Sequence, residues 1–172
     1  MTGKVSACMV ERAHPLTAMA AASVDCAEVS LTGLLPVMRS IVRRTSALGM
    51  AFPDTCRAVV NGNRALLWLG PDEFLLLAPE ETQQPSGAVD VSHRDTAIEV
   101  SGPYASWVIN AFCALDLHPS AFPIGMCTRT LFAKAQIVLW RTDTDVFHIE
   151  VARSFAPYVW ACLEEARREF LA

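Results

Sequence analysis

The densest group of chemically versatile side chains is the tetrapeptide Ser92-His93-Arg94-Asp95. A histidine beside an arginine and an aspartate could act as a proton acceptor or bind an anion. Serine and aspartate also favour turns, where histidine and arginine are commonly solvated. Nothing in the sequence orients or shields His93, so we favour a polar turn between two strands.

Two shorter polar pairs have similar alternatives. Arg153-Ser154 precedes the last predicted helix, where a helix N-terminus and a guanidinium could bind an anion. A capping serine and a packed arginine are the commoner outcome. Asp72-Glu73 would place two carboxylates together for acid–base work, but the pair falls in a predicted hairpin turn, where both should be solvated. We therefore predict no catalytic, cofactor-binding or metal-binding residue in this chain, which also lacks the G-x-G-x-x-G, P-loop and G-x-S-x-G patterns.

The cysteines and histidines are too dispersed to form an obvious site. The six cysteines stand at positions 8, 26, 56, 113, 127 and 162, without a C-x-x-C pair. This spacing argues against a structural zinc site and against a disulfide framework. We expect reduced thiols, no signal peptide and a cytoplasmic location.

Composition argues against two classes of partner. The net charge is −4, with 14 basic residues spread along the chain, so no basic stripe is available for nucleic acid. Hydrophobic residues make up 52% and the mean hydropathy is +0.30. No uncharged apolar run approaches the roughly 18 to 20 residues of a membrane helix, so we expect no membrane span. An apolar surplus without a membrane span indicates burial against another chain, or self-association of the isolated chain.

The elements that must position these residues follow from hydrophobic periodicity and turn signals. Residues 1–27 show little periodicity and are predicted to form an irregular arm. A helix is expected at Leu34–Leu48, with Arg39, Arg43 and Arg44 mostly on its polar side. The strands expected in the first half are Val29–Thr32, the hairpin Arg64–Leu69 with Glu73–Ala78, and Ala88–Ser92.

The second half has clearer signals. Ser101 should cap a helix with Pro103 in its first turn, and Ser154 should cap the final helix. The predicted strands are Thr96–Val100, Thr130–Trp140 and Asp145–Val151. The apolar face of the final helix should comprise Phe155, Tyr158, Val159, Cys162, Leu163, Ala166 and Phe170.

Four short segments recur in the same order at offsets of 70 to 73 residues. The pairs begin at Glu28 and Glu99, Ala51 and Ala121, Leu66 and Val138, and Glu73 and Val146. This recurrence predicts a duplicated strand–helix–strand–strand unit, over residues 28–92 and 93–172, within one domain at 28–172; coincidence in an apolar-rich chain is the alternative. The predicted fold class is α+β, a mainly antiparallel sheet with helices on one face.

Four longer segments carry a family resemblance. ALLWLGPDEFLLLAP at 65–79, VDVSHR at 89–94, LDLHPSAFPIG at 115–125 and VARSFAPY at 151–158 together resemble the gamma subunit of heterotetrameric sarcosine oxidase. The resemblance covers roughly residues 28 to 170. That subunit is similar in fold to the folate-binding domain of the glycine-cleavage T-protein, which has ferredoxin-like elements.

The resemblance implies a non-catalytic role inside a flavoenzyme that demethylates sarcosine to glycine, releases hydrogen peroxide and transfers the one-carbon unit to tetrahydrofolate. It also implies that FAD, FMN, NAD, folate and zinc bind to the partners, the large alpha and beta subunits and a small zinc-binding delta subunit. Residues 80–88 are shorter than the helical segment usual in the family, which puts the cover of one part of the sheet in doubt. The alternatives are a stand-alone folate-binding module of one-carbon metabolism and a scaffolding domain of the same fold.

Overall fold

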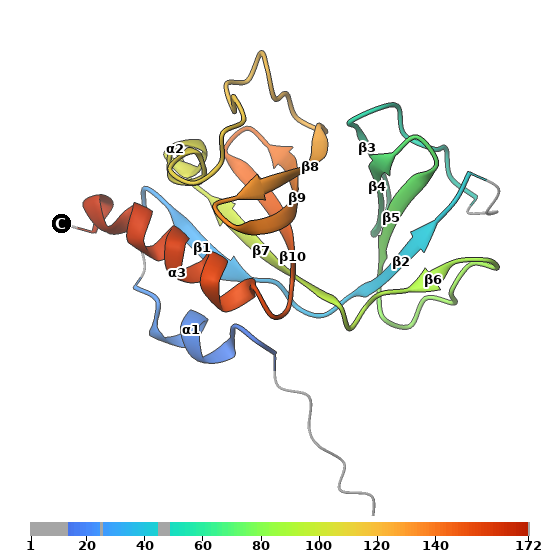
Figure 1. Ribbon diagram of the computed structural model, residues 1–172, viewed down its shortest axis with the longest axis horizontal. Coiled ribbons are helices and arrows are strands. Elements are labelled where there is room, and N and C mark those ends of the chain that lie inside the picture. The colour runs from blue at the N-terminus through green and yellow to red at the C-terminus, as the bar shows by residue number, and fades with distance from the viewer. Residues whose placement is uncertain (1–13, 25, 45–48, 172) are drawn as a thin grey trace, which may run out of the picture.

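The protein is built from two antiparallel sheets that face each other, as the computed structural model in Figure 1 shows. The structure describes residues 14–24, 26–44 and 49–171. Sheet A consists, in spatial order, of β1 (Ser30–Gly33), β7 (Asp95–Ser101), β10 (Val146–Ala152), β9 (Ala135–Asp143) and β8 (Cys127–Phe132). Sheet B consists of β3 (Ala58–Asn61), β4 (Arg64–Gly70), β5 (Glu73–Ala78), β2 (Met38–Val42) and β6 (Val89–Asp90). The predicted α+β class with mainly antiparallel sheet is confirmed.

The helices lie beside sheet A, on the side away from sheet B (Figure 1). They are α1 (Thr17–Ala22), α2 (Ala105–Asn110) and α3 (Ala156–Arg167), and the 3-10 helix η1 (Arg168–Phe170) follows α3. The chain passes from sheet A to sheet B between β1 and β2 and returns between β6 and β7 (Figure 1). A single β-bridge between Arg57 and Met126 also joins the two sheets.

The predicted helix at Leu34–Leu48 is wrong where the structure describes it. Residues Met38–Val42 form strand β2, which pairs with β5 on one side and β6 on the other. Both faces of β2 are enclosed, and even Arg39 is only 2% exposed. A strand that is apolar on both faces has no period of two, so Val37, Met38, Ile41 and Val42 imitate helical spacing. Residues 45–48 lie outside the described residues.

The prediction of an irregular N-terminal arm is wrong for its second part, while residues 1–13 lie outside the described chain. Residues Thr17–Ala22 form α1, and Leu16 just before it is fully buried in the core of sheet A. The segment TAMAAA has no amphipathic pattern, because alanine contributes little contrast between two faces. Alanine nevertheless has the highest helix propensity.

Two details of the second half also differ from prediction. The strand expected at Thr130–Trp140 is divided by a turn at Ala133-Lys134, where Ala133 adopts φ of +49° without a glycine or proline to signal it. The serine caps are wrong, because α2 and α3 are capped by Tyr104 and Phe155, without a side-chain hydrogen bond.

The final helix turns a different face to the sheet from the one predicted. Val159 and Leu163 are fully buried as expected, whereas Phe155 and Tyr158 remain 46% and 38% exposed. Trp160, which the predicted face left out, is only 1% exposed. The buried stripe is therefore rotated toward Trp160.

The predicted duplication matches the strand order in part. The order β3-β4-β5-β2 in sheet B is the same as β8-β9-β10-β7 in sheet A. Each sheet is completed by a different strand, since β6 follows its partners in sequence and β1 precedes them. Within the described residues, no helix interrupts sheet B, so the strand–helix–strand–strand unit does not hold for the first half. The division into 28–92 and 93–172 stays a prediction.

The core has three parts that follow the layers. The largest lies between sheet A and the helices, the second lies between the two sheets, and the third covers the outer face of sheet B. Loop residues Met50, Phe52 and Ala88 pack on that outer face in place of a helix, with the Phe52 and Phe74 rings 4.9 Å apart. The short 80–88 connection thus leaves sheet B covered by loops.

Candidate functional site

The most unusual chemistry lies between the two sheets. Arg39 on β2 and Glu150 on β10 face each other across the interface, and each side chain is only 2% exposed. Arg39 donates from Nε to Glu150 Oε2 at 2.7 Å and from Nη2 to Oε1 at 3.2 Å. Its Nη1 donates to the carbonyl oxygen of Val37 at 3.2 Å. The guanidinium therefore binds the carboxylate through two parallel hydrogen bonds.

His148, two residues before Glu150 on the same face of β10, completes this cluster. Its Nε2 lies 2.7 Å from Glu150 Oε1, and its side chain is 12% exposed. The imidazole ring also packs against Trp140 of the neighbouring strand, with ring centroids 5.6 Å apart. Trp140 Nε1 is enclosed and has no hydrogen-bond acceptor among the described residues.

The electrostatics of Glu150 decide what the cluster can do. Burial alone would raise the pKa of this carboxyl group. The hydrogen bond and charge of His148 and the charge and hydrogen bonds of Arg39 outweigh burial and lower the pKa to about 2. An anionic carboxylate whose two oxygens are occupied is a poor general base near neutral pH. The cluster therefore forms a polar connection between the sheets, in which both oxygens of Glu150 are engaged.

A cavity of about 410 Å³ opens beside this cluster, lined by Arg94, Asp95, Arg129, Gln136 and Phe155 among others. Arg94 pairs with Asp95 at 2.9 Å, and Arg129 pairs with Glu73 of sheet B. Both guanidinium groups that line the cavity are thus neutralised by a carboxylate, which weakens the case for an anion site here.

The tetrapeptide Ser92–Asp95 is a structural turn, as favoured from the sequence. Ser92 Oγ accepts the backbone N–H of Arg39 at 2.9 Å, and Asp90 Oδ1 accepts the N–H of Ser92 at 2.8 Å. His93 is exposed. Hydrogen bonding from Ser92 lowers the pKa of Asp90. This turn fixes the backbone of Arg39, and so it supports the buried ion pair indirectly.

The other two predicted pairs are not brought together with the buried cluster. Ser154 is exposed and does not cap α3, while the backbone N–H of Arg153 donates to the carbonyl oxygen of Arg94 at 3.0 Å. Asp72 accepts the N–H of Arg44 at 3.0 Å, and Glu73 binds Arg129. The two adjacent carboxylates thus have separate partners and do not form an acid–base pair.

Metal and thiol chemistry find little support in the described part of the chain. No group of three or more histidine, cysteine, aspartate or glutamate side chains there could hold a metal ion. The described cysteines, Cys26, Cys56, Cys113, Cys127 and Cys162, are all free thiols. Burial raises the pKa of Cys127 to about 12, so this thiol is not a nucleophile. No helix in the same part of the chain is both long and apolar enough to cross a bilayer.

Comparison with known proteins gives the family. The sequence profile of the sarcosine oxidase, gamma subunit family matches residues 35–169. This chain belongs to that family. It is 34% identical over 137 residues to the sarcosine oxidase subunit gamma of Corynebacterium sp. (strain P-1), covering 72% of this chain and 68% of the relative. It is 33% identical over 138 residues to that of Arthrobacter sp., covering 73% and 68%.

Structural comparison agrees with the family. A chain of heterotetrameric sarcosine oxidase from Corynebacterium sp. U-96, solved with pyrrole 2-carboxylate, superposes with a TM-score of 0.81 at 26% identity. The match covers 94% of this chain and 97% of that chain. Glycine cleavage system aminomethyltransferase T from Bartonella henselae matches with a TM-score of 0.56 at 12% identity, over 80% of this chain and 46% of its own. This second likeness concerns the fold alone.

Sequence reasoning missed Arg39 and Glu150. The sequence predicts Arg39 on the polar side of a helix where the structure has strand β2, and Glu150 falls within the predicted strand Asp145–Val151 without a signal for a site. One signal was present: Glu150 stands between Ile149 and Val151 in a strand whose other residues are largely apolar. A carboxylate between two apolar residues of such a strand needs a partner if it is buried.

Proposed function

We propose that this chain is a non-catalytic gamma subunit of a heterotetrameric sarcosine oxidase. The observation that carries the proposal is the superposition on a chain of such an enzyme along nearly the full length of both chains. The geometry supports the non-catalytic part, since the most buried carboxylate, Glu150, is held by Arg39 and His148. A subunit of this kind contributes by assembly, with the chemistry supplied by its partners.

The proposed reaction of the complete enzyme is the oxidative demethylation of sarcosine to glycine. Molecular oxygen accepts the two electrons and leaves as hydrogen peroxide, and the one-carbon unit passes to tetrahydrofolate. FAD, FMN, NAD, folate and zinc would be held by the alpha, beta and delta subunits, in a cytoplasmic complex. The family membership of this chain supports these proposals.

The stand-alone folate-binding module is not favoured. Such a module needs a polar group available in a concave pocket to hold the pterin ring. Between the sheets, Glu150, Arg94 and Arg129 are each engaged by a protein partner. The likeness to aminomethyltransferase T is a likeness of fold, and fold alone does not transfer a ligand.

Co-expression with the larger oxidase subunits of the same source tests the proposal. The chain should elute with them on size-exclusion chromatography and should gain thermal stability from them. Purified alone, it should carry no flavin absorbance and produce no peroxide from sarcosine. A chain that elutes separately from those subunits with an unchanged Tm would contradict the subunit assignment.

A further inference from the structure

We infer that the apolar groove between residues 35–37 and strand β3 is the docking site for an apolar segment of a larger oxidase subunit, with a basic residue beside that segment. This inference rests on the proposed function. The groove has a volume of about 600 Å³. Its walls include Leu35, Pro36, Val60 and Leu77, and Trp140 and His148 line it from sheet A.

A row of opposed residues on sheet B leads from the buried interior into the groove. Val60 lies opposite Ala65 on β4, and Ala65 lies opposite Leu77 on β5. Directly opposed residues share one face of an antiparallel sheet, so all three point toward sheet A. Ala65 and Leu77 are buried, but Val60 at the edge remains 59% exposed. The interior apolar face thus continues outward without a covering layer.

Two apolar side chains of the groove are exposed to solvent and would be buried by a partner. Leu35 is 82% exposed, the highest value for any large hydrophobic side chain in the described residues. It shares the groove with Val60, which stands on the edge strand of sheet B. Clustered apolar exposure around a concavity marks interaction sites, whereas scattered exposure does not. An edge strand also offers unpaired backbone groups to an extended segment.

The charges at the rim indicate the chemistry of the occupant. Glu80 and Glu81 follow β5 on the rim and are exposed, against the single guanidinium of Arg64. A basic residue beside the apolar segment would face these carboxylates, which favours correct docking and faster association. A second copy of this chain fits less well, because its own groove rim carries the same acidic excess.

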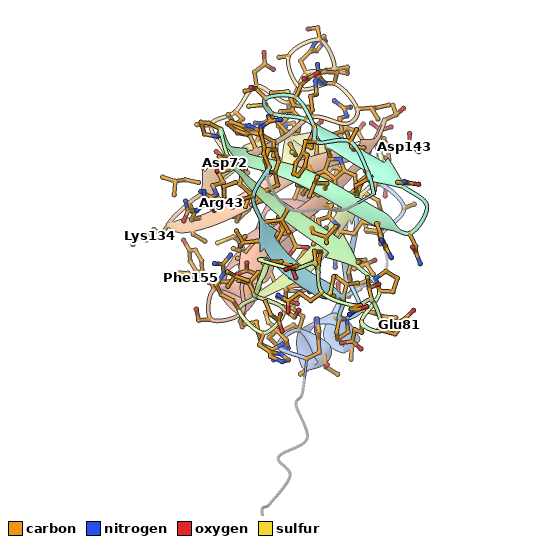
Figure 2. All side chains as sticks on the ribbon, turned by 90° about the vertical axis from the view of Figure 1, so that its right-hand side faces the viewer. Arg43, Asp72, Glu81, Lys134, Asp143 and Phe155 are labelled. Carbon is orange, nitrogen blue, oxygen red and sulfur yellow. The ribbon has the colours of Figure 1, made fainter. Side chains whose placement is uncertain are left out.

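The groove is separate from the polar cavity described above. Figure 2, which looks onto sheet B, shows Glu81 at one side of the molecule and Phe155 at the opposite side. Phe155 lines the polar cavity and Glu81 lines the groove. The two openings therefore differ: the ion pairs of Arg94 and Arg129 stand at one, and the exposed apolar side chains of Leu35 and Val60 stand at the other.

Two aspartate substitutions in the groove test the inference, with a matched control. Val60→Asp and Leu35→Asp should weaken binding of this chain to the larger oxidase subunits at least about tenfold, because each places a carboxylate in the buried contact. Leu131→Asp is the control: Leu131 is 61% exposed on edge strand β8 of sheet A. All three variants should keep the wild-type urea midpoint, since the replaced side chains are exposed in the isolated chain.

Binding is measured by titrating the labelled chain with the purified larger subunits. A photo-crosslinking amino acid at position 35 should link to a larger subunit, and the linked peptide should be apolar with a neighbouring lysine or arginine. Groove variants that bind like wild type would overturn the inference and leave the proposed function standing. So would an equal loss with Leu131→Asp, or crosslinking to a second copy of this chain. A wild-type chain that does not bind the larger subunits would overturn both.

Discussion

Removing the guanidinium of Arg39 should destabilise the isolated chain by about 3 kcal/mol or more at pH 7, since breaking a buried ion pair leaves an uncompensated charge. In Arg39→Met, Glu150 would lose both hydrogen bonds from Arg39. The buried carboxyl could avoid its charge only by binding a proton. Holding a proton at pH 7 on a carboxyl group whose ordinary pKa is 4.5 costs about 3 kcal/mol, at roughly 1.4 kcal/mol per pH unit.

The assay is urea unfolding of the wild-type chain and three variants. Arg129→Met removes an ion pair to Glu73 that also joins the sheets, but those side chains are 39% and 30% exposed, so its loss should stay near or below 1 kcal/mol. The double variant Arg39→Met/Glu150→Gln removes both buried charges and leaves an amide for His148. It should recover most of the stability that Arg39→Met loses.

A pH dependence provides an independent check. In Arg39→Met the folded state holds a proton on Glu150 that the unfolded state releases above pH 4.5. The loss of unfolding free energy in Arg39→Met, relative to wild type, should therefore shrink from about 3 kcal/mol at pH 7 to about 1 kcal/mol at pH 5. A loss for Arg39→Met no larger than for Arg129→Met, or a deficit independent of pH, would refute this account of the buried pair.

Three further predictions concern pH, packing and the backbone. The lowered pKa of Glu150 contributes stability that is complete above the unfolded pKa of 4.5 and is lost as the pH falls toward 2. Over that pH range, wild type should therefore lose more stability than Arg39→Met/Glu150→Gln, as measured by urea titration. Leu163→Ala, at a fully buried position in α3, should cost about 2 to 5 kcal/mol, whereas Leu131→Ala at an exposed position should cost less than about 1 kcal/mol; equal losses would mean that the stripe of α3 is not buried. Gly102 has φ of +122°, and a Cβ there would overlap the carbonyl oxygen of Glu28. Gly102→Ala should therefore lower the Tm far more than Gly87→Ala, where φ is +76° and the space is open; similar Tm values would contradict the close approach.

The elements that could be predicted from sequence are those bounded by an explicit turn. The hairpin of β4 and β5 combines apolar runs with Gly70-Pro71-Asp72 between them, and both strands lie where expected. The prediction for strand β2 failed because both faces of the strand are covered, which removes the alternation of apolar and polar residues. The turn at Ala133-Lys134 failed because its positive φ is carried by an alanine, a residue that gives no turn signal.

The site could not be predicted because its parts are distant in sequence. Arg39 and Glu150 are 111 residues apart, and neither segment indicates that the other lies beside it. Only the packing of sheet A against sheet B makes both of them buried and paired. The turn at Ser92–Asp95 could be predicted from local preferences, because serine and aspartate signal it within four consecutive residues.

The apolar surplus of the sequence predicted a partner, but its location could be argued only from the structure. Most large apolar side chains in the described residues are buried in the three core clusters. Composition alone therefore overstates the apolar surface that is exposed to a partner. The outer face of sheet B illustrates this, because Leu66 and Phe74 are fully buried beneath loops, although no helix among the described residues covers them. Two of the apolar side chains that remain exposed lie close together. Leu35 and Val60 share one concave surface at the open end of the sheets, and a partner that fills it would bury apolar area where the fold itself provides no covering layer.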